Sequence, residues 1–278
     1  MDGPQLLIND SPNLLLDAAA YVIWRAHEAG AQEQLGKTKL FKTLFLASWW
    51  AVQGHGSDIY NGPWYRIDRG PGLLTGQWEL LETILNSRYG IETSTLKMWH
   101  GHPQVCFSRP TRAPQTLTRS PLKQPLDAAF TDVISLTADE AAAMTYDTEP
   151  MIWLIAEERA KWGGTTQYRQ FNLRDTNRDK FLALASQYTK GIIEPDDIAR
   201  QMGHQWKTHD VVVYLDAFGI HRSLEEASLS TKAKKEILAK LASEIRTGSV
   251  RSGPSSTEKA LASARLEEEY VSPSSLPE

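Results

Sequence analysis

The chain has 278 residues, of which 41% are hydrophobic and 23% are charged, so it is long enough to bury a core and is not expected to be disordered throughout. Its 30 lysines and arginines against 34 aspartates and glutamates give a net charge of −4, too near balance for a protein that coats nucleic acid or a membrane surface. The one cysteine, Cys106, excludes an internal disulfide and a multi-cysteine zinc site. We find no signal-peptide pattern and no apolar run of bilayer length, so we expect a cytoplasmic protein that does not enter a membrane.

Tryptophan is distributed unevenly along the chain: of nine tryptophans, only Trp206 lies beyond residue 162. Because a buried tryptophan contributes a large apolar area, the denser core is expected in the N-terminal part. A polar stretch at 172–177 predicts a boundary there. We therefore divide the chain into a first domain over 1–175, a helical module over 176–247 and a flexible tail over 248–278, which is rich in Ser, Pro and Glu.

Three helices are expected in the first 90 residues. The first begins near Ser11-Pro12 and ends at Gly30, and the second runs over about 38–53 with apolar residues around nearly its whole circumference, which is typical of a central buried helix. The third follows Gly70-Pro71, which we interpret as fixing its entry, and stops at Gly90.

Two short strands at 93–99 and 104–108 then predict a β-hairpin, and two later helices follow Thr137 and Thr148. The predicted class is mainly α: a compact helical domain with a small β-hairpin, followed by a helix-turn-helix-like module.

The order of these pieces, with two short motifs, resembles the Panacea domain, also called the SocA-like or DUF4065 family. The first motif is the Lys-Leu-x-Lys-type start of the buried helix, here Lys39, Leu40 and Lys42, and the second is the pair Gly70 and Pro71. The resemblance covers residues 13–165. It implies an antitoxin that neutralises a cognate toxin by direct protein binding, without a catalytic site or cofactor. It also implies accessory modules that bind operator DNA.

The motif lysines have two interpretations. Lys39 and Lys42 are three residues apart and so share a helix face, where they either meet an acidic partner or keep the helix end hydrated while their stems pack.

A basic segment between Lys97 and Lys123 contains five lysines and arginines and no acidic residue, and its prolines predict an extended loop. Together with the hairpin it is our candidate partner-binding surface, because exposed arginines on a stiff loop bind carboxylates or phosphates. A solvated loop is the alternative. The candidate partner-binding residues are Lys97, Trp99, Arg109, Arg112 and Arg119.

Metal and catalytic signals are weak. His100 and His102 near Cys106 are possible ligands or a nucleophile–base set, but no second ligand group with zinc-like spacing follows, and no hydrolase, P-loop or dinucleotide motif occurs. We therefore predict no metal, no cofactor and no enzyme activity.

The module over 176–247 contains a candidate helix-turn-helix. A supporting helix carries Phe181 and Tyr188, a second opens at Pro195, and a third carries Val211 and Tyr214, although Val211–Val213 is also compatible with a strand. The exposed start of the third helix presents the candidate DNA-binding residues Lys207, Thr208 and His209. Residues 192–221 hold two basic and five acidic residues, which weakens the DNA interpretation unless a basic helix over 231–246 compensates.

The leading hypothesis is a toxin-binding antitoxin that also regulates its own operon. The alternative is a DNA-binding transcriptional regulator whose first domain senses a protein or a ligand.

Overall fold

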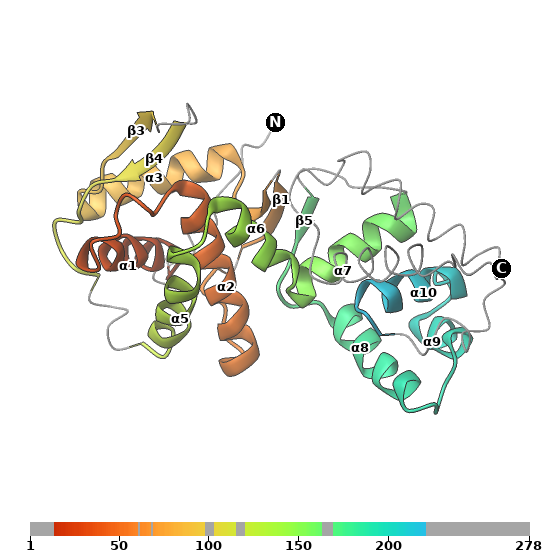
Figure 1. The fold of residues 1–278 in the computed structure, drawn as a ribbon. Helices are drawn as coiled ribbons and strands as arrows, with labels where there is room; N and C mark the ends of the chain where they lie inside the picture. Colours follow the sequence, from red (N-terminus) through yellow and green to blue (C-terminus); the bar gives the residue numbers. More distant parts are fainter. Residues whose placement is uncertain are drawn as a thin grey trace, which may run out of the picture. The chain divides into compact units, whose positions relative to one another are not determined.

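The computed structural model describes residues 14–60, 62–67, 69–97, 103–114, 120–162 and 169–220 (Figure 1). It is mainly helical with small antiparallel sheets, which confirms the predicted fold class. The described residues form two compact units. Unit 1 comprises residues up to 145 together with 167–174, and unit 2 comprises 146–166 together with the chain from 175 onward. The predicted tail at 248–278 and the predicted helix at 231–246 lie outside the described residues.

Unit 1 is built around one central helix. This helix, α2 (Lys37–His55), packs against α1 (Leu14–Glu28) and α5 (Lys123–Ile134). Leu40, Leu44 and Phe45 are fully buried on it, as expected for a helix that is apolar on nearly all sides. Its end is set by Gly56, whose φ of 62° allows the left-handed turn that returns its N–H to the last carbonyls of the helix. Ser11 and Pro12, the predicted start of the first helix, lie outside the described residues.

A three-stranded antiparallel sheet completes unit 1, in the order β2–β1–β5. Strand β1 (Trp64–Ile67) pairs with β2 (Gly70–Gly72) on one side and with β5 (Arg169–Phe171) on the other. The interpretation of Gly70-Pro71 as the entry to the third helix is wrong, because these residues form β2. The helix, α3 (Thr75–Tyr89), begins later, with Leu74 as its N-cap. Trp64 anchors the sheet, since it is fully buried edge-to-face against Phe45.

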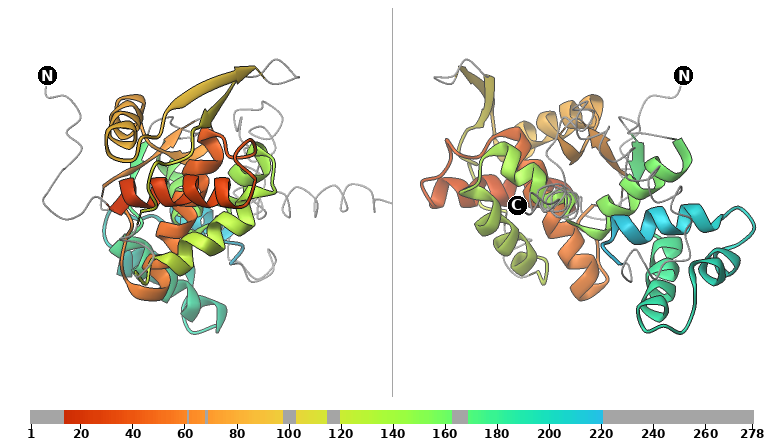
Figure 2. Two further views of the ribbon diagram at one scale, coloured as in Figure 1. Left: turned by 90° about the vertical axis from the view of Figure 1, so that its left-hand side faces the viewer. Right: turned by 45° about the vertical axis from the view of Figure 1, so that its right-hand side comes forward.

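The β-hairpin predicted after α3 is present. Strands β3 (Thr93–Lys97) and β4 (Pro103–Phe107) pair antiparallel, with Thr93 opposite Phe107 and Lys97 opposite Pro103. Phe107 is buried and packs edge-to-face on Trp78 of α3, which fixes the base of the hairpin to unit 1. Two views show the hairpin extending beyond the helices of this unit (Figure 2).

Helix α6 (Ala138–Tyr146) lies in unit 1 except for its last residue, and its N-terminus is capped by Thr137 as the sequence predicts. The Thr137 hydroxyl accepts the Glu140 N–H while the Glu140 carboxylate accepts the Thr137 N–H, a reciprocal pair that satisfies two amide donors at the helix start.

Unit 2 is held by an aromatic cluster. Helix α7 (Glu149–Glu157) continues as a π-helical turn, η1 (Glu158–Trp162), and is followed in unit 2 by α8 (Thr176–Thr189), α9 (Pro195–Met202) and α10 (Thr208–Ala217). Trp153 of α7 packs against Phe181 and Tyr214 of this unit, with ring centroids 5.6 and 4.5 Å away. Unit 2 therefore begins at Tyr146, upstream of the polar stretch at 172–177 that marks the predicted boundary. Residues 211–213 are helical, so the strand alternative is wrong.

Among the helices in the described parts of the chain, none combines the length and the apolar character that a bilayer crossing needs.

Candidate functional site

The motif residues behind the family resemblance come together inside unit 1. Lys42 is 1% exposed, and its Nζ donates a hydrogen bond of 2.8 Å to the carbonyl oxygen of Pro71. Gly70, with a φ of 85°, provides the backbone conformation that leads into that carbonyl. Burial, and secondarily the nearby Arg69 guanidinium, hold the pKa of the Lys42 ammonium well below its usual value. This lysine connects α2 to β2.

Two other motif residues also make contacts within unit 1, Leu40 in the core and Lys39 at a half-buried position. Leu40 is fully buried, and the Nζ of Lys39 donates 2.8 Å to the carbonyl of Ile134 at the end of α5. The expectation that Lys42 meets a partner or keeps the helix end hydrated is wrong, because its whole side chain is in the core. The charge of a lysine normally keeps at least its tip in water, and only the contact with β2, which was not predicted, identifies the exception.

A buried carboxylate that the sequence analysis missed joins α1 to α3. Asp17 is fully buried, accepts a hydrogen bond from the Tyr89 hydroxyl, and lies 3.6 Å from Nη2 of Arg88. Burial and the bond to Asp17 raise the pKa of Tyr89 to about 12. The one available signal was an acidic residue within the apolar stretch of a helix that otherwise buries Leu16 and Ala18.

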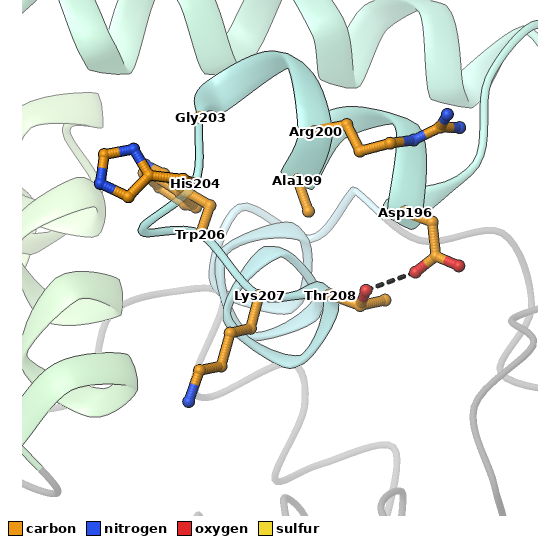
Figure 3. A pocket seen from close by; sticks show the side chains of 8 residues that line it. All are labelled: Asp196, Ala199, Arg200, Gly203, His204, Trp206, Lys207 and Thr208. Carbon is orange, nitrogen blue, oxygen red and sulfur yellow. Dashed lines mark hydrogen bonds between the residues drawn. The ribbon is translucent and has the colours of Figure 1, made fainter.

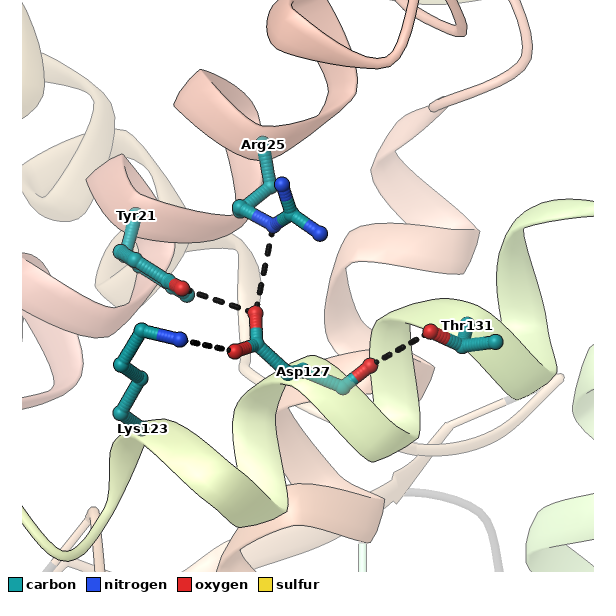
Figure 4. A network of polar contacts seen from close by, with 5 residues as sticks. All are labelled: Tyr21, Arg25, Lys123, Asp127 and Thr131. Carbon is teal, nitrogen blue, oxygen red and sulfur yellow. Dashed lines mark hydrogen bonds and ion pairs between the residues drawn. The ribbon is translucent and has the colours of Figure 1, made fainter.

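A second carboxylate, Asp127, joins α1 to α5 (Figure 4). It accepts a hydrogen bond of 2.8 Å from the Tyr21 hydroxyl and forms ion pairs with Arg25, at 3.2 Å, and with Lys123. Burial alone raises the pKa of Asp127, but the hydrogen bonds from Lys123 and Tyr21 outweigh it and leave the pKa below its usual value. Lys123, the last cation of the basic segment, therefore has a structural partner.

Two of the five candidate partner-binding residues have described side chains, and both fasten the segment after β4 to unit 1. Arg109 pairs with Glu28 of α1, and Arg112 donates 2.7 Å to the carbonyl of Arg88 and lies over the ring of Tyr89. Both remain exposed, so their remaining donors face water. Trp99, Arg119 and the side chain of Lys97 lie outside the described residues.

Strand β3 presents exposed, uncharged side chains over residues 94–96. Ser94, Thr95 and Leu96 of β3 are all exposed, whereas Gln104, Val105 and Cys106 of β4 are half-buried. Leu96 is 48% exposed and is one of two large apolar side chains, with Ile192, that stand out in the described residues. Because side chains alternate along a strand, Ser94 and Leu96 share one face of the hairpin.

A second candidate surface is an open pocket of about 760 Å³ in unit 2, where α9 meets the start of α10 (Figure 3). It brings two of the three candidate DNA-binding residues together, while His209 is exposed on the next position of the helix. The Thr208 hydroxyl contacts Asp196, and Arg200 is paired with Asp197. The lining residues are Asp196, Ala199, Arg200, Gly203, His204, Trp206, Lys207 and Thr208.

Helix α10 is poorly suited to phosphate contacts beyond its first turn. It contains no lysine or arginine, and most of the residues of its last two turns, including Val211, Tyr214 and Leu215, are buried. Since phosphate neutralisation dominates DNA affinity, any DNA contact by this helix depends on Lys207 at its N-cap position.

The described residues offer little metal or nucleophilic chemistry. They contain no group of three or more His, Cys, Asp and Glu side chains placed to hold a metal ion. Burial and the Glu33 carboxylate raise the pKa of the Cys106 thiol, which disfavours the reactive thiolate. His100 and His102, the other members of that candidate set, lie outside the described residues.

The comparisons with known proteins return no match: no protein-family model, no curated protein and no solved structure is similar to this chain. The resemblance to the Panacea domain therefore stays a prediction that rests on the motif residues.

Proposed function

We propose that this protein is an antitoxin that neutralises a cognate toxin by direct protein binding through unit 1. The observation that supports this most is the exposed face of the β3–β4 hairpin, where Leu96 leaves half of a large apolar side chain in water. Apolar side chains at the centre of an interface, with arginines at its rim, are the composition typical of protein-binding surfaces.

The surrounding residues support a rigid binding surface. Phe107 fixes one strand of the hairpin to α3, and Arg109 and Arg112 hold the following segment against α1 and α3. A surface that is ordered before binding loses less conformational entropy when the toxin docks. Neutralisation is then steric: the antitoxin covers the toxin's active surface, and no chemical step is needed.

The test is co-expression of the full chain with the product of each flanking gene, scored by growth and then by co-purification. We expect one neighbour to be toxic alone and rescued by this chain. The variant Leu96→Glu should lose rescue. Ile192→Glu, which makes the same change at the exposed apolar side chain of unit 2, should retain it. If no neighbour is toxic, or if both variants rescue equally well, the proposal is wrong in its function or in its surface.

A second candidate function is DNA binding by unit 2, in a transcriptional regulator or an autoregulating antitoxin. Its support is the pocket between α9 and α10, which has Lys207 on its rim. Lys207→Glu should weaken binding to the upstream operator by about 1–3 kcal/mol if this residue reads a base. Lys190→Glu, an equal charge change at an exposed position beyond the end of α8, is the matched control. Equal effects of the two variants would indicate non-specific attraction only.

A further inference from the structure

Strand β3 pairs with β4 along one edge, and along its other edge no strand of the described residues lies beside it. The N–H of Ser108 donates to the carbonyl of Glu92 at 2.9 Å, and the N–H of Glu92 donates to the Ser108 hydroxyl at 2.8 Å. One backbone bond therefore joins Glu92 and Ser108 at the base of the hairpin, in the phase of a hydrogen-bonded pair. In an antiparallel ladder such pairs alternate with pairs whose backbone groups point outward. In the register of the hairpin, Thr93, Thr95 and Lys97 therefore direct their N–H and C=O groups away from β4.

The same alternation assigns outward backbone groups to Val105 and Phe107 on β4. Unlike the outer edge of β3 in the described residues, this edge of β4 is contacted by other parts of unit 1. The carbonyl of Phe107 is bonded at 2.9 Å by Nε2 of His27 from α1, and Gln104 anchors its side chain on the carbonyl of Glu33. In the described residues the sheet contains only β3 and β4, so no strand covers the outer edge of β3.

Natural edge strands are usually protected by charged side chains, by proline or by a bulge. In β3 the one charged residue is Lys97 at the end of the strand; residues 93–96 carry no charge and no proline, and the pairing with β4 is continuous over all five residues. The exposed side chains Ser94, Thr95 and Leu96 leave this edge accessible from both faces.

We propose that this edge pairs with β3 of a second copy of the chain, antiparallel and centred on Thr95, to form a four-stranded sheet across a two-fold axis. This register pairs Thr95 with Thr95 of the second copy and Thr93 with Lys97 of the second copy, and it uses every outward backbone group of the strand. The charges are complementary in the same register. The Thr93 hydroxyl contacts Glu82, so a carboxylate lies beside the residue that Lys97 of the second copy faces, at both ends of the interface.

This pairing goes beyond the proposed function and does not depend on it, because it uses the edge of β3, whereas toxin binding is assigned to the face of the hairpin that carries Leu96. A five-residue edge buries less surface than a standard interface. The dimer is therefore weak, with a Kd between about 10 μM and 1 mM.

The test is sedimentation equilibrium of the full chain at about 10 μM to 1 mM, the range that the expected Kd requires. Wild type should show a reversible monomer–dimer equilibrium. Thr95→Pro removes an N–H that points outward, so the bonds to β4 survive, and the dimer should weaken at least tenfold. Thr95→Val keeps this N–H and is the matched control that should still dimerise. Unchanged far-ultraviolet circular dichroism of both variants verifies folding.

Two further variants test the register. Lys97→Glu should weaken the dimer, and adding Glu82→Lys to the same chain should restore it by exchanging both charges. In a Cys106→Ser background, Thr95→Cys should form an intermolecular disulfide on oxidation, whereas Leu96→Cys should not, because Leu96 faces Ser94 of the second copy.

The proposal is overturned if the chain is monomeric at 1 mM. It is equally overturned if the dimer is insensitive to Thr95→Pro, since self-association then uses another surface.

Discussion

The two units are stabilised in different ways. In unit 1, single polar side chains connect segments that are far apart in the sequence: Lys42 connects α2 to β2, Asp17 connects α1 to α3, and Asp127 connects α1 to α5. In unit 2, rings from α7, α8 and α10 meet in one aromatic cluster around Phe181. Unit 2 also buries Glu158 and Arg178, but its described packing is mainly apolar. Unit 1 therefore adds a few directional contacts to an extensive apolar core, whereas the described packing of unit 2 centres on one aromatic cluster.

The largest effect is expected from removing the centre of the cluster in unit 2. Phe181 is fully buried and contacts Trp153, Trp206 and Tyr214. Phe181→Ala should lower the free energy of unfolding of unit 2 by about 3–5 kcal/mol, because a large cavity is left among rings that cannot collapse into it. Amide hydrogen exchange in the two units measures this, with unit 1 as the internal reference. Leu182→Ala, at the half-buried neighbouring position, should cost much less.

In unit 1 the corresponding experiment is at Lys42. Lys42→Ala should lower the free energy of unfolding by about 2–5 kcal/mol, because it opens a cavity and leaves the Pro71 carbonyl without its donor. Lys42→Met, which keeps the apolar stem and removes the desolvated amine, should cost less. Urea unfolding followed by fluorescence compares the two variants. Equal losses would mean that the hydrogen bond to β2, and not the packing of the stem, is what matters.

Lys42 also predicts a pH dependence. Because its pKa is lowered in the folded state, the unfolded chain binds more protons at this site, and the stability of unit 1 should increase as the pH rises toward the ordinary lysine pKa. Lys42→Met should lack this increase between pH 8 and about 10, the range below the ordinary lysine pKa. If the stability of wild type and of the variant changes with pH in parallel, the lowered pKa of Lys42 in the folded state is contradicted.

Asp58 predicts a smaller pH dependence of stability, and here the stability of unit 1 decreases as the pH rises. Burial raises its pKa to about 6, although its carboxylate accepts the N–H of Tyr60 at 2.9 Å. Its folded-state pKa lies above its unfolded value, so the stabilising contribution of the protonated form is lost as the pH rises through 6. Asp58→Asn, which retains an acceptor, should therefore stabilise unit 1 by about 2 kcal/mol at pH 7 and have little effect below pH 4. Thermal unfolding at both pH values measures the difference.

The smallest effect is expected from removing the Tyr89 hydroxyl, which donates a hydrogen bond to Asp17. Tyr89→Phe should cost about 1–2 kcal/mol, because a fully buried carboxylate loses a donor. Tyr21→Phe is the matched control: it removes an equivalent bond to Asp127, whose side chain is 28% exposed and so regains water. We expect a smaller loss there. If the two losses are equal, the burial of the acceptor does not determine the cost.

The sequence predicts the elements whose apolar spacing is regular. The residues spaced along α8, Phe181, Ala185 and Tyr188, are all buried, and the hairpin of β3 and β4 lies where alternation and its turn place it. Patterns of this kind depend only on local periodicity.

The features that the sequence does not predict depend on contacts between residues far apart in the chain. Strand β5 has three residues and no alternation, and it pairs with a strand about one hundred residues earlier, so nothing local indicates the sheet. A buried lysine contradicts the ordinary behaviour of its residue type and is recognised only once β2 is known to lie above α2. The same holds for Trp153, whose helix precedes the polar stretch at 172–177 and yet packs in unit 2.

The path of the chain has a consequence for its synthesis. Residues 146–166 belong to unit 2, residues 167–174 return to unit 1, and the chain then re-enters unit 2. No single cut separates the two units. During translation, unit 1 lacks the outer strand of its sheet until Phe171 has left the ribosome, by which time α7 has already emerged with Trp153 and without its aromatic partners from α8 and α10. A nascent chain paused at this point carries the apolar helix α7 without the aromatic side chains that bury Trp153 in the folded protein.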